Sequence, residues 1–149
     1  MTVLQYRLAT CSYSQFKPEM GLPVRASLGG PRWWKKPIPR EQTVFEIAPG
    51  RQYFKEPDDE VFHAKFRAQL DRIGVEHLID RFNDVGFSAG CAIGDTLVAM
   101  CFEKLMTWDD LRCHRSMFRI WWLEQTGEQI PELGLPPDTP DAVPDLTLF

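Results

Sequence analysis

The sequence has few cysteines and no long apolar run. Its four cysteines form no Cys-x-x-Cys pair, which excludes a dense disulfide framework and favours free thiols in a reducing cytoplasm. No stretch approaches the about 20 apolar residues that a membrane helix needs. The first residues lack the basic region and apolar core of a signal peptide. We therefore expect a cytoplasmic protein without a membrane span.

Two segments lack charge of one sign. No Lys or Arg follows Arg119, whereas acidic residues continue to Asp145. Residues 20 to 40 lack Asp and Glu and contain Arg25, Arg32, Lys35, Lys36 and Arg40. The net charge of −4 argues against bulk nucleic-acid binding. The asymmetry nevertheless leaves a basic front segment and an acidic tail.

The remaining composition, 44% hydrophobic and 26% charged, fits one globular domain with a substantial core. Apolar patterns predict strands at 4–10, 24–27, 43–47 and 97–102, and an edge strand at 130–133. Helical spacing predicts helices at 57–73, 75–85 and 108–126. This alternation predicts an α/β domain over residues 1–134, with a parallel or mixed sheet flanked by helices. Residues 135–149, rich in Pro and Asp, are expected to form a disordered C-terminal tail.

The most informative stretch joins the strand at 97–102 to the helix that follows it. Cys101 and Glu103 are expected at the carboxyl end of the strand. Cys113, His114 and Arg115 are expected in the first two turns of the helix, for which Thr107 and Asp110 resemble an N-terminal capping box. Ligands of open α/β sheets bind at this edge. The sequence therefore predicts a site here.

This stretch also carries a resemblance to a known family. Cys101-Phe102-Glu103-Lys104 followed by Cys113-His114-Arg115 resembles the family called domain of unknown function 488. The turn Ser12-Tyr13-Ser14 and the element beginning Val24-Arg25 fit the family's order. The resemblance covers residues 5 to 135 and implies a Rossmann-like three-layer sandwich. The chemistry of that family is largely unassigned, so the resemblance implies no mechanism.

Three residues are candidates for catalysis. Cys113, near a helix start and beside His114, has surroundings that favour a nucleophilic thiolate; alternatively it is a small buried hydrophobic residue. His114 and Glu103 are candidates for proton transfer. Alternatively, His114 locks the loop through a backbone carbonyl and Glu103 neutralises Arg115.

Phosphate or substrate binding is expected from cations and from the first turn. Arg115 can clamp a phosphate or carboxylate through two hydrogen bonds; the alternative is an ion pair with Glu103, Asp109 or Asp110. The hydroxyl and N–H groups of the turn are expected to face the same crevice. The full predicted set is Ser12, Tyr13, Ser14, Arg25, Arg32 and Arg115.

A metal site would use Cys101, Cys113 and His114. Zinc sites usually show two close ligand pairs, and the adjacent residues Cys113 and His114 are expected to point in different directions. Neither a metal nor another cofactor is therefore predicted. His63 and His77 are expected on solvated helix surfaces.

The segment Arg32-Trp33-Trp34-Lys35-Lys36 combines basic and aromatic side chains. Proteins that bind single strands or flipped bases pair phosphate contacts with stacking in this way. Alternatively, Trp33 and Trp34 cover the edge of the sheet. The segment thus predicts nucleic acid or nucleotide as a partner.

The residues Asp145-Leu146-Thr147-Leu148-Phe149 resemble the short motif that binds bacterial sliding clamps, whose usual form begins with Gln. Leu146, Leu148 and Phe149 match its apolar positions, and Asp145 departs from the Gln. Apolar anchors on a disordered peptide are a common recognition device. The alternative is that the tail packs on its own domain.

Together these features predict an enzyme, in the hydrolase class, acting on a nucleotide or nucleic acid in DNA repair or modification. A carboxylate near cations allows N-glycosidic or phosphoester cleavage. One alternative is a non-catalytic adaptor or binding module of DNA metabolism, in which Cys113-His114-Arg115 forms only internal hydrogen bonds and packing contacts. A weaker alternative is a thiol-dependent enzyme that uses Cys113.

Overall fold

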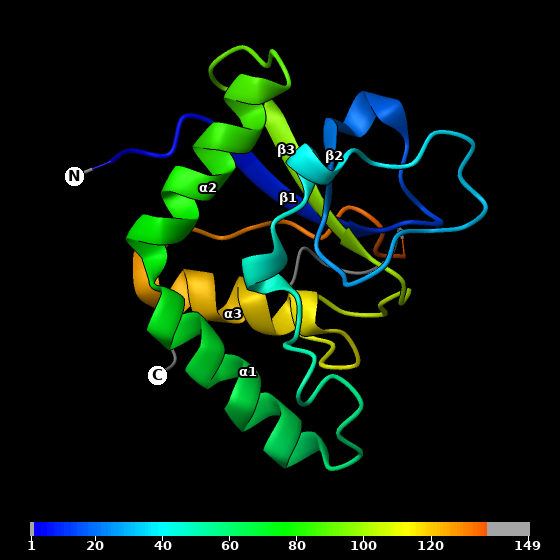
Figure 1. Cartoon of the computed structure of the whole chain (residues 1–149), viewed down its shortest axis with the longest axis vertical. Helices are drawn as coiled ribbons and strands as arrows, with labels where there is room; N and C mark the ends of the chain where they lie inside the picture. Colours follow the sequence, from blue (N-terminus) through cyan, green and yellow to red (C-terminus); the bar gives the residue numbers. More distant parts are fainter. Residues whose placement is uncertain (1, 137–149) are drawn as a thin grey trace.

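The computed structural model describes residues 2–136. Within them a three-stranded parallel sheet has the order β1-β3-β2. The strands are β1 (Arg7–Ser12), β2 (Leu22–Arg25) and β3 (Thr96–Cys101), as Figure 1 shows. The central β3 is flanked on both edges, which explains its continuous apolar sequence. The predicted α/β class and parallel sheet are confirmed.

The described helices lie against one face of this sheet. They are α1 (Asp59–Ile73), α2 (Val75–Ser88) and α3 (His114–Thr126), and their buried side chains form one cluster with Leu97 and Ala99 of β3. Val98 and Met100 point to the opposite face, as strand alternation requires. Among the described residues that face is covered by side chains of irregular segments, which are Phe16, Met20, Trp34 and Ile38. The predicted third layer of helices is therefore not confirmed.

The beginning of α1 and the boundary between α1 and α2 follow the sequence signals, whereas the end of α2 does not. The Asp58 side chain accepts hydrogen bonds from the backbone N–H groups of Glu60 and Val61 and begins α1. Gly74 separates α1 from α2. Helix α2 was expected to end before Gly86 but continues to Ser88. Gly86 lies against the ring of Tyr6, where a Cβ would collide with the ring. This glycine permits packing and does not end the helix.

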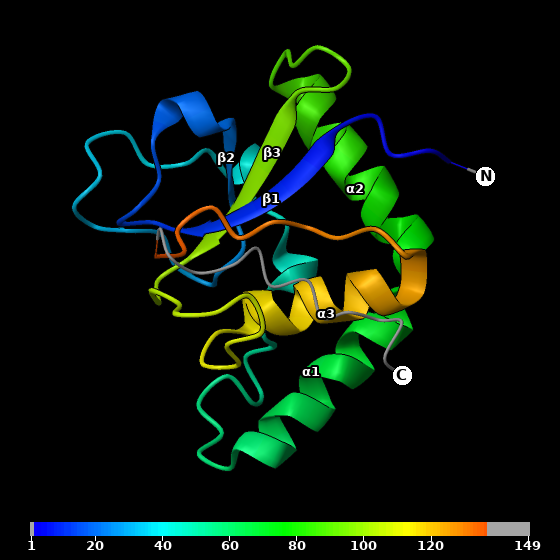
Figure 2. The same ribbon diagram turned by 180° about the vertical axis from the view of Figure 1, so that it is seen from behind.

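Two predicted strands are wrong. The segment 43–47 forms a single bridge between Thr43 and Arg25 and then the 3₁₀ helix Phe45–Ile47. The segment 130–133 forms a single parallel bridge between Glu132 and Thr10. Figure 2 shows this last segment running along β1. Both segments extend the sheet by single bridges, because 3₁₀ turns or proline interrupt them.

The predicted start of α3 at residue 108 is also wrong. The Asp110 carboxylate accepts hydrogen bonds from the backbone N–H groups of Met106 and Arg112 and from the Arg112 guanidinium. These bonds hold a separate turn, so the expected capping box at Thr107 does not start the helix. The extended backbone of Cys113 (φ −126°) precedes α3 instead.

None of the helices in residues 2–136 combines the length and apolar character needed to cross a membrane.

Candidate functional site

A cavity of about 740 Å³ opens beside the carboxyl ends of β2 and β3. Ser27, two residues after β2, and Phe102, directly after β3, line it, together with the start of α1 and the segment that leads into α3. Glu103, Cys113 and His114 also line it, so the structure brings these predicted residues together. Other lining residues were not predicted from the sequence, among them Phe54, Glu56, Asp59, Phe62, Asp110 and Arg112.

His114 is half-buried and held in one orientation. Its Nε2 lies 2.6 Å from the carbonyl oxygen of Ala26, and its ring packs edge-on against Phe66. Because a carbonyl only accepts, Nε2 carries the hydrogen and Nδ1 of the neutral ring keeps its lone pair. Burial lowers the His114 pKa to about 4. The bond to a backbone carbonyl is the contact that the structural alternative for His114 expected, and it leaves Nδ1 to other partners.

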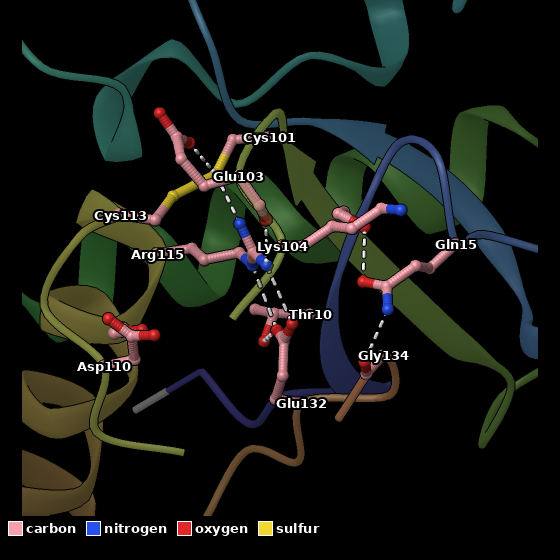
Figure 3. A network of polar contacts seen from close by, with 12 residues as sticks. Thr10, Gln15, Cys101, Glu103, Lys104, Asp110, Cys113, Arg115, Glu132 and Gly134 are labelled. Carbon is pink, nitrogen blue, oxygen red and sulfur yellow. Dashed lines mark hydrogen bonds and ion pairs between the residues drawn. A yellow bond between two sulfur atoms is a disulfide. The ribbon is translucent and has the colours of Figure 1, made fainter. Parts of the chain in front are cut away.

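Cys101 and Cys113 form a disulfide (Figure 3). The expectation that all cysteines are free thiols is therefore wrong, and the sequence separation of 12 residues gave no signal for the pairing. The loop before α3 folds back and brings Cys113 to the end of β3. In this state Cys113 has no thiolate, so its predicted nucleophilic role requires prior reduction. Cys11 and Cys91 are free, and burial raises the pKa of the Cys11 thiol to about 11.

Arg115 lies in the core, away from the cavity. Its guanidinium pairs with the Glu132 carboxylate at 2.8 Å and donates to the Cys101 sulfur and the Glu103 carbonyl (Figure 3). Arg119, one turn later, shares the same carboxylate. The ion-pair partner of Arg115 is therefore Glu132. It is not the side chain of Glu103, Asp109 or Asp110, as the sequence had suggested. The one sequence signal that placed Glu132 beside the sheet was the edge strand predicted at 130–133.

The turn after β1 does not line the cavity. Ser12 is buried and donates to the Gln15 side chain, and Ser14 is exposed. Tyr13 is buried on the opposite face of the sheet, where burial raises its pKa to about 12. Its hydroxyl lies 2.6 Å from the hydroxyl of Ser27, a lining residue. Tyr13 therefore supports the cavity wall from behind.

The predicted cations also lie outside the cavity. The Arg25 guanidinium stacks 5.1 Å from the ring centre of Phe45. Arg32, Lys35 and Lys36 are exposed on the loop that follows β2. Trp34 of this loop packs edge-on against Tyr13 and covers one face of the sheet, whereas the alternative had expected it to cover the edge of the sheet.

Trp33 differs from Trp34 because 60% of it is exposed. Its ring centre lies 6.1 Å from that of Phe102, which lines the cavity and is 44% exposed. The two rings form an aromatic surface that joins the basic loop to the cavity.

The cavity lining is rich in carboxylates. Glu56, Asp59 and Glu103 face it with Asp110, whereas Arg112 is the one Lys or Arg among the described lining residues. Arg112 is bound to Asp110 at 2.6 Å, and this pairing lowers the Asp110 pKa. His63, expected to be solvated, is half-buried and lines the cavity. His77 is on the surface as expected and bonds Glu46.

The atoms that could hold a metal converge, contrary to the expectation that Cys113 and His114 point apart. One nitrogen of His114 and the sulfurs of Cys101 and Cys113 all lie within 4.8 Å of one another. These three residues, which were not predicted to bind a metal, are therefore neighbours in space.

No protein-family model matches the chain, and neither a curated protein nor a solved structure matches it. The resemblance to the domain of unknown function 488 stays a prediction from its motifs. The clamp-like residues Leu146, Leu148 and Phe149 lie outside the described residues.

Proposed function

We propose that the chain binds a nucleotide or single-stranded nucleic acid across the basic loop and cleaves an N-glycosidic bond in the cavity. The observation that carries this proposal is the contact between exposed Trp33 and Phe102 at the cavity wall. It connects a cationic, aromatic surface to a cavity that contains carboxylates. Binders of single strands combine these same two properties, cations for the backbone and aromatic rings for the bases.

The cavity itself suits an aromatic base. Phe54, Phe62 and Phe102 contribute apolar rings to its wall, and its volume of about 740 Å³ is within the range of small-molecule sites. The cations of the loop lie outside it, so the phosphates would stay on the loop while the base enters. A base removed from its stack is read in this way by enzymes that act on bases.

The lining favours N-glycosidic over phosphoester cleavage. Its carboxylates outnumber its single arginine, which is already paired with Asp110. They would repel a phosphate but stabilise the positive charge that develops on a sugar during glycosidic cleavage. Glu103, exposed at the end of β3, is the carboxylate we assign to this role. The proposal includes a Rossmann-like site at the carboxyl edge of the sheet. It also includes a role in DNA repair.

A second candidate is a binding module without catalysis. It is favoured by the burial of Arg115, which is 1% exposed and engaged with Glu132 and not with the cavity. In this case the segment from Cys113 to Arg115 only stabilises the fold, and the basic loop binds nucleic acid alone.

Release of free base from oligonucleotides and nucleosides, followed by chromatography, separates these candidates. Glu103→Gln should abolish base release and keep oligonucleotide affinity within about twofold, because the loop is untouched. Glu76→Gln, an exposed acid on α2, is the matched control and should retain both. Binding without release of base would support the binding module. Absence of both binding and release would overturn the proposed function.

A further inference from the structure

We propose that Cys101, Cys113 and His114 form a binding site for a divalent transition metal of the zinc class, which loads when the Cys101–Cys113 disulfide is reduced. The metal site does not depend on the proposed function, since its test is metal binding itself.

The ligand geometry fits such an ion. Tetrahedral zinc, with bonds of about 2.3 Å to sulfur and about 2.0 Å to nitrogen, places those two ligand atoms about 3.5 Å apart. The Cys113 sulfur and His114 Nδ1 are 3.8 Å apart. The Cα atoms of Cys101 and Cys113 are separated by 7.7 Å. Most disulfides span about 4.4–6.8 Å between these atoms. The backbone spacing therefore leaves room for a metal between the reduced sulfurs.

His114 is oriented as a metal ligand is. Metal-binding histidines usually donate their second N–H to a carbonyl or carboxylate, which fixes the ring and its tautomer. Here Nε2 donates to the Ala26 carbonyl, and the ring is packed by Phe66. Nδ1, near the Cys113 sulfur, therefore keeps its lone pair for an ion before any ion binds.

The surroundings also suit a thiolate at Cys101. Arg115, whose side chain is 1% exposed, places Nη1 at 2.9 Å from the Cys101 sulfur. Arg115 and Arg119 share the Glu132 carboxylate, so within residues 2–136 this cluster pairs two buried cations with one buried anion. A guanidinium that donates to sulfur stabilises the charged thiolate that binds metals.

The three residues leave a fourth position open. Cys113 and His114 line the cavity, and a Glu103 carboxylate oxygen lies 3.8 Å from the Cys101 sulfur. Three protein ligands with one position facing a cavity are the arrangement of catalytic zinc sites, in which the fourth ligand is water. Glu103 is placed to accept a proton from that water.

Loading is coupled to redox state. A dithiol reductant transfers two electrons and two protons to the Cys101–Cys113 disulfide and is itself oxidised to a disulfide. Binding of one divalent ion by the two thiols then releases their two protons to solvent. A disulfide oxidant accepts two electrons from the two thiolates and is reduced to a dithiol, which re-forms the Cys101–Cys113 disulfide and releases the ion. The disulfide in the structure is the state that does not bind metal.

The experiment is a Co²⁺ and Zn²⁺ titration of the full chain, with and without prior reduction by a phosphine under anaerobic conditions. The reduced chain should bind one Co²⁺, with sulfur-to-cobalt charge-transfer absorption and the visible bands of tetrahedral cobalt. Zn²⁺ should displace it. The same chain with its disulfide intact should show no such bands. This comparison requires no substitution.

Variants then identify the ligands. Cys101→Ser, Cys113→Ser and His114→Asn should each weaken Zn²⁺ binding at least about tenfold. Cys11→Ser and Cys91→Ser, at the two free cysteines, should retain wild-type affinity. Circular dichroism checks that each variant is folded. The proposal is overturned if the reduced, folded wild type lacks the charge-transfer absorption. It is equally overturned if the free-cysteine variants lose that absorption while the three ligand variants keep it.

Discussion

Arg115 and Glu132 form a bidentate ion pair in the core, with Arg115 Nε at 3.0 Å and Nη2 at 2.8 Å from the two carboxylate oxygens. The neighbouring His114 lines the cavity. Adjacent positions of a helix face directions about 100° apart, so α3 directs one residue into the core and the other into the cavity. The Cys-His-Arg motif therefore combines a structural and a cavity-facing side chain.

The first prediction concerns this ion pair. Glu132→Gln should lower the free energy of unfolding by about 3–5 kcal/mol, because it leaves the buried Arg115 and Arg119 without a counter-charge. Urea denaturation measures the change. The matched control is Glu124→Gln, which breaks an exposed pair with Arg67 and should cost less than about 1 kcal/mol. Equal losses in the two variants would show that the buried pair does not stabilise the fold.

The second prediction concerns the pH dependence given by His114. Its folded pKa of about 4 lies below the ordinary value of 6.5. Between those values the unfolded chain binds one more proton than the folded chain. Stability should therefore be complete above pH 6.5 and fall as the pH drops to 4, by at most about 1.4 kcal/mol per pH unit.

The measurement is urea denaturation from pH 7 to pH 4 with the disulfide intact and a chelator present. His114→Asn, which has no ionisable ring, should show a smaller slope in this window than the wild type. Identical slopes would mean that the imidazole does not gain a proton on unfolding.

The sheet and the long helices could be predicted from the sequence because local patterns determine them. The apolar run at 97–102 and the spacing of Phe62, Phe66 and Leu70 each identify a buried element without knowledge of the rest of the chain. The strand predicted at 43–47 could not be rejected in this way, because Val44 and Ile47 are buried as apolar strand residues would be. The 3₁₀ turn there leaves Phe45 39% exposed, so the apolar pattern did not identify the backbone conformation.

The site was predicted only in part because several of its contacts are long-range. Glu103, Cys113 and His114 were placed correctly at the carboxyl edge, since strand and helix order locates that edge. The Arg115 partner Glu132 lies 17 residues away, in a segment whose docking depends on a single bridge to β1. Likewise, the cavity acids Glu56 and Asp59 come from the segment that begins α1, and no sequence motif joins them to Glu103.

The third prediction separates the two tryptophans of the basic loop. Trp33→Ala should reduce affinity for a single-stranded oligonucleotide by about 1–3 kcal/mol, the scale of one stacked base. Its stability should change by no more than about 0.5 kcal/mol, since most of the side chain is exposed. Fluorescence anisotropy and thermal unfolding measure the two effects.

Trp108→Phe is the contrast, because it removes the buried bond from the indole N–H to the Ile130 carbonyl and should lower stability. Unchanged oligonucleotide affinity in Trp33→Ala would show that Trp33 does not stack on a base.

The fourth prediction concerns the cations beside Trp33. Lys35 and Lys36 are exposed and lie in a segment without acidic residues, so they are available to phosphates. Oligonucleotide affinity should fall steeply with salt, because each phosphate contact releases counterions. The double variant Lys35→Ala and Lys36→Ala should reduce the slope of log affinity against log salt by about 1.4, at about 0.7 for each contact with a single strand.

The control removes two exposed cations of α1, Lys65 and Arg72, and changes the net charge equally. If both double variants lower the slope to the same extent, the effect reflects net charge alone and the loop is not the binding surface.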